Sequence, residues 1–280
     1  MSTAAPHVTD AAFSRRLERA EAKASAAYVE SRARHLPSLG AESRDFDGTY
    51  AMFDGVGSPL SQTFGLGLHS APSHEQLEQI ESYFRDRGAE IFHEVSPLAD
   101  PAILGILAER GYNPIELTSV LYQRLTSVDH APEPDAAASL RVRRLEAGEE
   151  STWAETAARG WSESPEAAAF MREFGTVSAT SVGTTCFVAE WDGRPIAAAA
   201  LGIHDRVALL AGASTDPPYR GRGAQNALLG VRLRYAALAG CDLAMMGALP
   251  GSASQRNAER QGFRIAYTRI KWQKRAERAS

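Results

Sequence analysis

A short run of glycine and arginine in the second half of the chain has the composition of an anion-binding loop: Arg220-Gly221-Arg222-Gly223-Ala224. Its two glycines let backbone N–H groups converge on one point because no Cβ obstructs them. The helix predicted to follow adds unpaired N–H donors and the positive end of its dipole. The two arginines add charge. Together these groups predict a diphosphate site, although a flexible, solvated turn has the same composition.

The residues before this loop are small. Ala213, Ser214 and Thr215 end a predicted strand, and Pro217-Pro218 follow. Small side chains let an extended ligand arm approach the strand, whereas bulky ones would block it. A tightly packed strand end is an equally good interpretation of these three residues alone.

This stretch resembles motif A of the GNAT N-acetyltransferase superfamily, in which Arg or Gln is followed by any two residues, Gly, any residue, and Gly or Ala. Arg220, Gly223 and Gln225 occupy these positions here, so a glutamine replaces the last small residue. The resemblance covers residues 139–273, with the Asp192-Gly193 turn and a closing Gly262-Phe263.

The resemblance implies two splayed parallel strands, at residues 207–215 and 243–247, with the pantetheine arm of acetyl-CoA between them. It implies acetyl-CoA as cosubstrate, without a metal. The residues expected to contact the cofactor are Ala213, Ser214, Thr215, Arg220, Gly221, Arg222, Gly223, Ala224, Gln225, Ser254 and Asn257.

Catalytic residues are less defined by the resemblance. Family members often place an Asn and a Tyr on the helix before Gly-Phe, the Tyr protonating the leaving thiolate; here these positions hold Gly251 and Ala258. Ser254 on the same helix and Tyr267 on the last strand are expected to serve instead. Their alternatives are a helix cap for Ser254 and a half-buried strand aromatic for Tyr267.

A general base has two carboxylate candidates. Glu163 follows Trp161 in a predicted loop, and Asp205 lies in a predicted hairpin. A base assists amine attack only if its pKa is raised towards the working pH. Both carboxylates could equally be surface groups, and Trp161 could line the acceptor pocket or pack in the core.

The elements that position these residues follow from apolar spacing and turn signals. Helices are predicted over residues 10–34, 73–87, 100–110, 149–174 (two helices), 225–239 and 253–261. Strands are predicted over residues 49–53, 62–68, 91–95, 119–122, 140–142, 187–189, 195–201, 207–213, 243–246 and 265–272. This order predicts an α+β fold with a mixed α/β sheet. The resemblance implies that it forms two tandem GNAT-like acyl-CoA N-acyltransferase domains.

The two halves of the chain also resemble each other. Residues 83–91 match residues 235–243, and residues 108–112 match residues 258–263 with one insertion. A duplication explains these matches better than chance. The predicted domains are residues 1–125, a degenerate GNAT-like domain, and residues 139–280, a catalytic domain, joined by a linker at 126–138.

The first half has no counterpart of the glycine/arginine loop. Its residues 68–73 contain neither Gly nor Arg, and Pro72 lacks an N–H. We therefore expect this half to bind no CoA and to shape the acceptor site or supply an interface. His69 and His93 are isolated, and such histidines are usually surface or satisfied core groups.

Composition excludes several functional classes. The 280 residues are 44% hydrophobic and 23% charged, with a net charge of −4 and a pI near 6.0, which argues against binding nucleic acid or anionic membranes. No apolar run is long enough for a membrane span and no secretion signal is recognisable, so the expected location is cytoplasmic. Cys186 and Cys241 are expected to be buried free thiols.

The predicted function is N-acetyltransferase: direct transfer of an acetyl group from acetyl-CoA to a primary amine of a small molecule, in the C-terminal domain. A homodimer is possible. One alternative is an acyl-CoA-binding regulator or pseudoenzyme. Another is a protein-lysine or N-terminal acetyltransferase, which has the same chemistry with a different acceptor.

Overall fold

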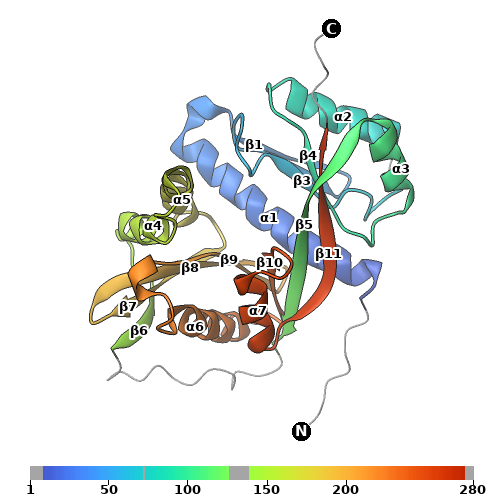
Figure 1. The fold of residues 1–280 in the computed structure, drawn as a ribbon. Helices are drawn as coiled ribbons and strands as arrows, with labels where there is room; N and C mark the ends of the chain where they lie inside the picture. Colours follow the sequence, from blue (N-terminus) through green and yellow to red (C-terminus); the bar gives the residue numbers. More distant parts are fainter. Residues whose placement is uncertain (1–8, 72, 126–138, 275–280) are drawn as a thin grey trace. The chain divides into compact units, whose positions relative to one another are not determined.

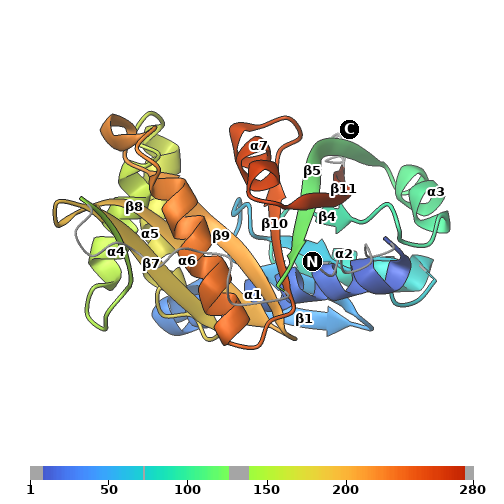
Figure 2. The same ribbon diagram turned by 90° about the horizontal axis from the view of Figure 1, so that it is seen from below.

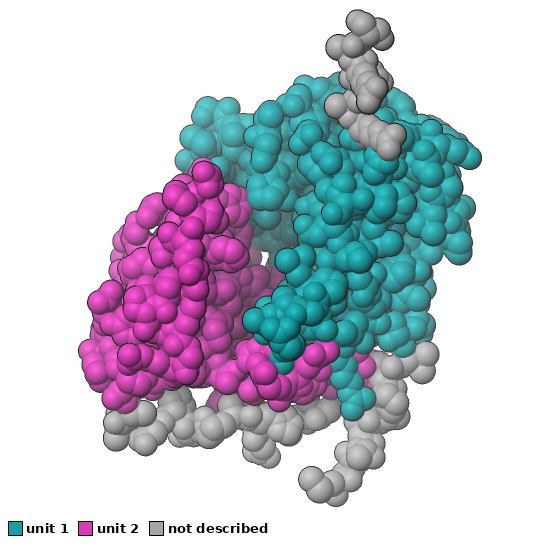
Figure 3. All heavy atoms as spheres, viewed as in Figure 1, with its two compact units in different colours: residues 1–121, 247–256, 264–280 teal, residues 122–246, 257–263 magenta. Residues whose placement is uncertain are grey.

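The computed structural model describes residues 9–71, 73–125 and 139–274. They form seven α-helices and eleven strands in a mixed α/β fold, as predicted (Figure 1). The predicted linker and Pro72 lie outside the described residues. The chain divides into two compact units, coloured in Figure 3: unit 1 comprises residues 1–121, 247–256 and 264–280, and unit 2 residues 122–246 and 257–263. This division differs from the halves of the sequence, and the domain boundaries drawn there stay a prediction.

Unit 1 begins with a long helix. Asp10 caps it by accepting a hydrogen bond from the Phe13 N–H (2.8 Å), and it continues to His35. The elements of this unit are α1 (Ala11–His35), β1 (Glu42–Phe46), β2 (Thr49–Phe53), β3 (Gln62–Phe64), α2 (His74–Arg85), β4 (Phe92–Val95), α3 (Ala102–Glu109), most of β5 (Tyr112–Arg124), and β11 (Arg264–Lys274). The strand order is β1-β2-β3-β4-β11-β5.

The last strand joins this sheet by antiparallel pairing with β4, with Ile270 opposite Val95 and Gln273 opposite Phe92. Strand β1 was not predicted. Its sequence, Glu-Ser-Arg-Asp-Phe, is polar, and only Phe46 is buried. It is the edge strand of this sheet. The turn after it, Asp47-Gly48, has positive φ at both residues, which suits a tight hairpin.

Unit 2 contains β6 (Leu140–Arg144), α4 (Glu150–Arg159), α5 (Pro165–Ser178), β7 (Thr184–Trp191), β8 (Arg194–His204), β9 (Val207–Thr215), α6 (Ala224–Leu238), most of β10 (Leu243–Ala248), and part of α7 (Ala253–Arg260). The strand order is β10-β9-β8-β7-β6. Helices α4 and α5 cover one face of β7, β8 and β9, and α6 covers the other (Figures 1 and 2).

Alternation along β7 explains the two covered faces of this sheet. Cys186 and Val188 join a core cluster around Trp153 of α4. Phe187, between them, meets the Tyr235 ring of α6 edge-on, with centroids 5.6 Å apart. Successive side chains of a strand point to opposite faces, so both faces need apolar residues.

The parallel pair of strands predicted from the resemblance is present. Leu243–Met245 of β10 lie opposite Val207–Leu209 of β9. The predicted hairpin turn between β7 and β8 is also confirmed, with φ of 48° at Asp192 and 78° at Gly193. No helix among the described residues is both long and apolar enough to span a bilayer.

Candidate active site

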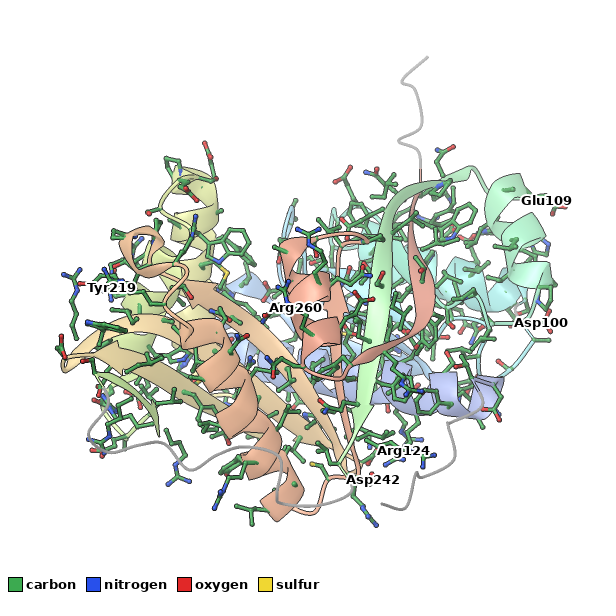
Figure 4. The ribbon with its side chains drawn as sticks, turned by 60° about the horizontal axis from the view of Figure 1, so that its bottom comes forward. Asp100, Glu109, Arg124, Tyr219, Asp242 and Arg260 are labelled. Atoms are coloured by element: carbon green, nitrogen blue, oxygen red, sulfur yellow. The ribbon has the colours of Figure 1, made fainter. Side chains whose placement is uncertain are left out.

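The loop between β9 and α6 turns on two glycines in the left-handed region. Gly221 has φ of 79° and Gly223 φ of 83°, which glycine adopts without strain. Gly223 is the N-cap of α6, and no side chain caps this helix. Tyr219, labelled in Figure 4, lies in the short 3-10 turn (Pro217–Tyr219) at the start of the loop.

The backbone N–H groups of this loop are available to a ligand. Among the described residues, no acceptor is found for the N–H groups of residues 221–226. The first helical hydrogen bond of α6 runs from the Ala227 N–H to the Gly223 carbonyl (3.0 Å). A run of unpaired N–H groups at a helix N-terminus favours an anion. The diphosphate contacts of residues 220–224 stay a prediction. The unpaired N–H groups of this loop are what such contacts require.

The two arginines of the loop differ in their partners. Arg220 donates to the Glu163 carboxylate (Nη1 to Oε2, 2.7 Å) and to the Gly160 carbonyl (Nη2, 3.0 Å). Arg222 lies over the rings of Trp191 (4.9 Å) and Tyr219 (5.3 Å). No carboxylate of the described residues forms an ion pair with Arg222, so its charge is not neutralised locally.

The end of β9 is held by its side chains. The Ser214 hydroxyl donates to the Ala157 carbonyl of α4 (2.9 Å). The Thr215 hydroxyl accepts a hydrogen bond from Gln225 Nε2 (2.8 Å). Gln225, which replaces the small residue of the family pattern, therefore joins the start of α6 to the end of β9.

A β-bulge interrupts β9 just before these residues, and the sequence did not predict it. Ala200 of β8 lies opposite Ala211, but Ala198 lies opposite Ser214, so β9 has one extra residue. Gly212 in the bulge has φ of 60°. A bulge leaves backbone groups unpaired and redirects the strand, here next to Ala213, which is exposed.

Gly160, at the C-terminus of α4, is a second feature that was missed. A Cβ on Gly160 would stand 2.4 Å from the Ser214 Cβ and 3.0 Å from the Thr215 N. The carbonyl of Gly160 also accepts from Arg220. The glycine after an amphipathic helix could have been recognised as a helix end, but its contact with β9 is not a local property of the sequence.

The residues predicted on α7 are exposed or partly exposed. Ser254 belongs to unit 1 and Asn257 to unit 2, and neither side chain has a hydrogen bond among the described residues. The suggestion that Ser254 caps α7 is wrong: the Gln255 N–H binds the hydroxyl of Ser252 (3.2 Å). The contacts of Ser254 and Asn257 with the cofactor stay predictions.

Tyr267 is buried in unit 1. Its hydroxyl donates to Glu18 Oε1 (2.8 Å), and burial raises its pKa well above the ordinary value of 10. Burial also raises the pKa of Glu18 to about 7. Arg269 lies beside this pair, 3.2 Å from Glu18 Oε2. The catalytic role of Tyr267 stays a prediction, and its hydroxyl already has an acceptor.

The candidate bases lie at the surface or in a turn. Glu163 is exposed and ion-paired with Arg220 (2.7 Å), and Asp205 occupies a hairpin turn with φ of 49°. Trp161 is 47% exposed, so it does not pack in the core. Its place in an acceptor pocket stays a prediction.

The two histidines of the first half have the ordinary environments expected for them. His93 is buried between the Thr63 hydroxyl (2.7 Å) and the Tyr112 hydroxyl (3.0 Å), and burial lowers its pKa to about 3. His69 packs against Gly48. Within the described residues, no group of His, Cys, Asp and Glu side chains has the arrangement of a metal site.

Comparison with known proteins agrees with this architecture. Residues 146–263 match the acetyltransferase (GNAT) family. A GCN5-related N-acetyltransferase from Kribbella flavida has a similar structure, with a TM-score of 0.63 and 18% identity over 90% of this chain and 96% of that one. Another from Sphaerobacter thermophilus has a TM-score of 0.55 and 15% identity, covering 91% of each chain.

A tandem GNAT protein from the clavulanic acid biosynthesis pathway is also similar, with a TM-score of 0.58 and 14% identity over 83% of this chain and 79% of that one. No curated protein matches the sequence. The match at residues 146–263 supports an acyltransferase, and the similar solved structures, a tandem GNAT protein among them, share the fold of this chain.

Proposed function

We propose that the protein is an N-acetyltransferase that moves an acetyl group from acetyl-CoA to a primary amine of a small molecule. The observation that carries the proposal is the set of unpaired N–H groups at residues 221–226, beside the unneutralised charge of Arg222. Hydrogen bonds to a charged acceptor contribute about 1.5–3 kcal/mol each. A diphosphate that receives several of them would anchor acetyl-CoA in unit 2.

Direct transfer needs little covalent chemistry from the protein. The amine nitrogen forms a bond to the thioester carbon, the C–S bond breaks, its electron pair goes to sulfur, and the amine loses a proton. Positioning of the two reactants and N–H donors near the carbonyl oxygen supply most of the rate gain in such reactions. Gly212 and Ala213 have no partner in the register of β8 and β9, and a bulge leaves backbone groups unpaired, so this is the part of β9 that we expect to supply such donors.

The proton-transfer roles follow the sequence predictions. Tyr267 or Ser254 would protonate the thiolate, and Glu163 would accept the proton of the amine. Glu163 lies beside the loop and is ion-paired with Arg220, so its assignment rests on the sequence alone. Replacing Tyr267 by Phe, Ser254 by Ala and Glu163 by Gln one at a time, and measuring kcat as a function of pH, tests these three assignments.

Cofactor binding is the first test. We expect Arg220→Glu and Arg222→Glu each to weaken CoA binding by about tenfold or more, since each places a negative charge beside the diphosphate. Arg144→Glu, which reverses a charge at an exposed position of β6 in the same unit, is the matched control. Calorimetry would discard the proposal if wild type gave no heat with CoA, or if both loop variants bound as tightly as the control.

The acceptor is tested separately by thiol release. The purified protein is mixed with acetyl-CoA and a panel of small primary amines, and with a lysine-containing peptide and a free N-terminal peptide. Release with small amines supports the proposed acceptor. Release only with peptides would instead favour a protein acetyltransferase, and tight CoA binding without release from any acceptor would favour a regulator or pseudoenzyme.

A further inference from the structure

Arg232 is a fully interior arginine in the middle of α6. Its side chain is only 3% exposed, and the residues around it on the helix are mostly apolar or small. Burial lowers the pKa of Arg232 to about 10, so the guanidinium is still charged at neutral pH. Among the described residues, no carboxylate forms an ion pair with it.

The guanidinium is bound to backbone carbonyls. Nε donates to the carbonyl of Leu228 one turn earlier (3.2 Å). Nη1 donates to the carbonyls of Ala200 (3.0 Å) and Ala211 (3.5 Å). Nη2 has no protein acceptor among the described residues.

The two strand carbonyls that accept from Arg232, those of Ala200 and Ala211, lie directly beside the bulge of β9. Ala200 and Ala211 face each other in the last β8–β9 pair before the extra residue, and the next pair is Ala198 with Ser214. Arg232 therefore binds both strands at the point where the ladder breaks. From there β9 continues through Gly212 and Ala213 to the residues beside the glycine/arginine loop.

Stability alone does not account for this arginine. A charge is almost never fully buried without a partner of opposite sign, because desolvating it costs several kcal/mol. Even a buried ion pair can often be replaced by apolar side chains of similar volume without loss of stability, and Arg232 has no ion-pair partner among the described residues to offset its desolvation. The position is therefore better explained by what a positive charge does at the bulge.

We propose that Arg232 is a positioning residue for acyl transfer: it holds the bulge of β9 so that the freed N–H groups face the thioester carbonyl, and its charge favours the negative charge of the transition state. This inference rests on the proposed function, in which the thioester lies along β9. As the N–C bond forms and the C–S bond breaks, negative charge passes through the carbonyl oxygen to sulfur. A positive charge inside the domain is poorly screened by solvent, so it stabilises negative charge on the carbonyl oxygen and on the sulfur.

The test compares Arg232→Met, Arg232→Lys and, as a matched control on the same helix, Arg234→Met. For each we would measure kcat, KM for acetyl-CoA, the Kd for CoA and the urea unfolding midpoint. We expect Arg232→Met to lower kcat by about 10- to 100-fold, with the Kd for CoA within threefold and stability equal to or above that of wild type. Arg232→Lys, which keeps the charge but not the fork of donors, should recover part of kcat.

The outcomes separate this inference from the proposed function. If wild type neither binds CoA nor releases thiol, the proposed function fails. If wild type is active and Arg232→Met keeps kcat within threefold of wild type, the role of Arg232 is refuted. If Arg232→Met does not fold, Arg232→Lys decides: a kcat equal to wild type overturns the proposal, and a reduced kcat with unchanged CoA affinity supports it.

Discussion

The contact of Gly160 with β9 can be tested by adding a single methyl group. In Gly160→Ala the new Cβ would meet the Ser214 Cβ at 2.4 Å, the Ser214 Oγ at 2.5 Å and the Thr215 N at 3.0 Å. Ordinary van der Waals contacts begin near 3.4 Å, so Ser214 has to move by about 1 Å. It is not free to do so, because it donates to the Ala157 carbonyl and pairs with Ala198.

Two effects of opposite sign compete in this variant. Gly160 has helical backbone angles, φ −62° and ψ −16°, so alanine would gain up to about 1 kcal/mol from lower unfolded-state entropy if space were open. Overpacking a rigid site costs about 1–3 kcal/mol. The clash involves a strand and not the end of a flexible side chain, so we expect the steric term to dominate, with a net loss of about 1–2 kcal/mol.

The control is Gly105→Ala in the middle of α3. A Cβ at Gly105 meets nothing within 4 Å, so this variant should gain about 0.5–1 kcal/mol. Urea unfolding of both variants shows directly whether Gly160→Ala lowers the free energy of unfolding and Gly105→Ala raises it. Calorimetry with CoA should also show weaker binding for Gly160→Ala, since Thr215 and the Arg220 contact shift with it. A Gly160→Ala protein as stable as Gly105→Ala, with unchanged CoA affinity, would refute the reasoning.

Three further predictions concern the loop, the buried acid and the thiols. Gly223→Ala should lower stability by about 1–2 kcal/mol, because φ is 83° there, and should weaken CoA binding in calorimetry; unchanged values of both would contradict the role of this turn. Glu18 has its pKa raised by burial to about 7 from 4.5, so the folded state binds its proton more tightly and wild-type stability should fall as pH rises from about 4.5 to 7. Glu18→Gln should reduce the difference in unfolding free energy between pH 5 and pH 7.5, as measured by urea unfolding. A difference equal to that of wild type would count against this role of Glu18. Cys186 and Cys241 are both buried and neither forms a disulfide, and burial raises the pKa of Cys186 to about 12, so a thiol reagent should react fully only after denaturation; fast reaction of the native protein would disprove their burial.

Local sequence features determined much of what positions the site. Apolar periodicity located the helices of both units, and the Asp192-Gly193 turn was identified by residue type because only such residues adopt positive φ readily. The glycine/arginine loop was also a local signal: Gly221 and Gly223 supply the left-handed backbone and α6 supplies the unpaired N–H groups. These properties depend on a few adjacent residues, and so a single sequence contains them.

Tertiary structure alone decided the partners of those residues. Tyr267 donates to Glu18, 249 positions away in the chain, and Arg220 binds Glu163 and Gly160 across a separation of about 60 positions. The bulge at Gly212 and the arginine beneath it, Arg232, depend on the register between β8 and β9 and on the helix packed against them. Such contacts are set by which surfaces the chain buries together, and no local pattern of residue types encodes that choice.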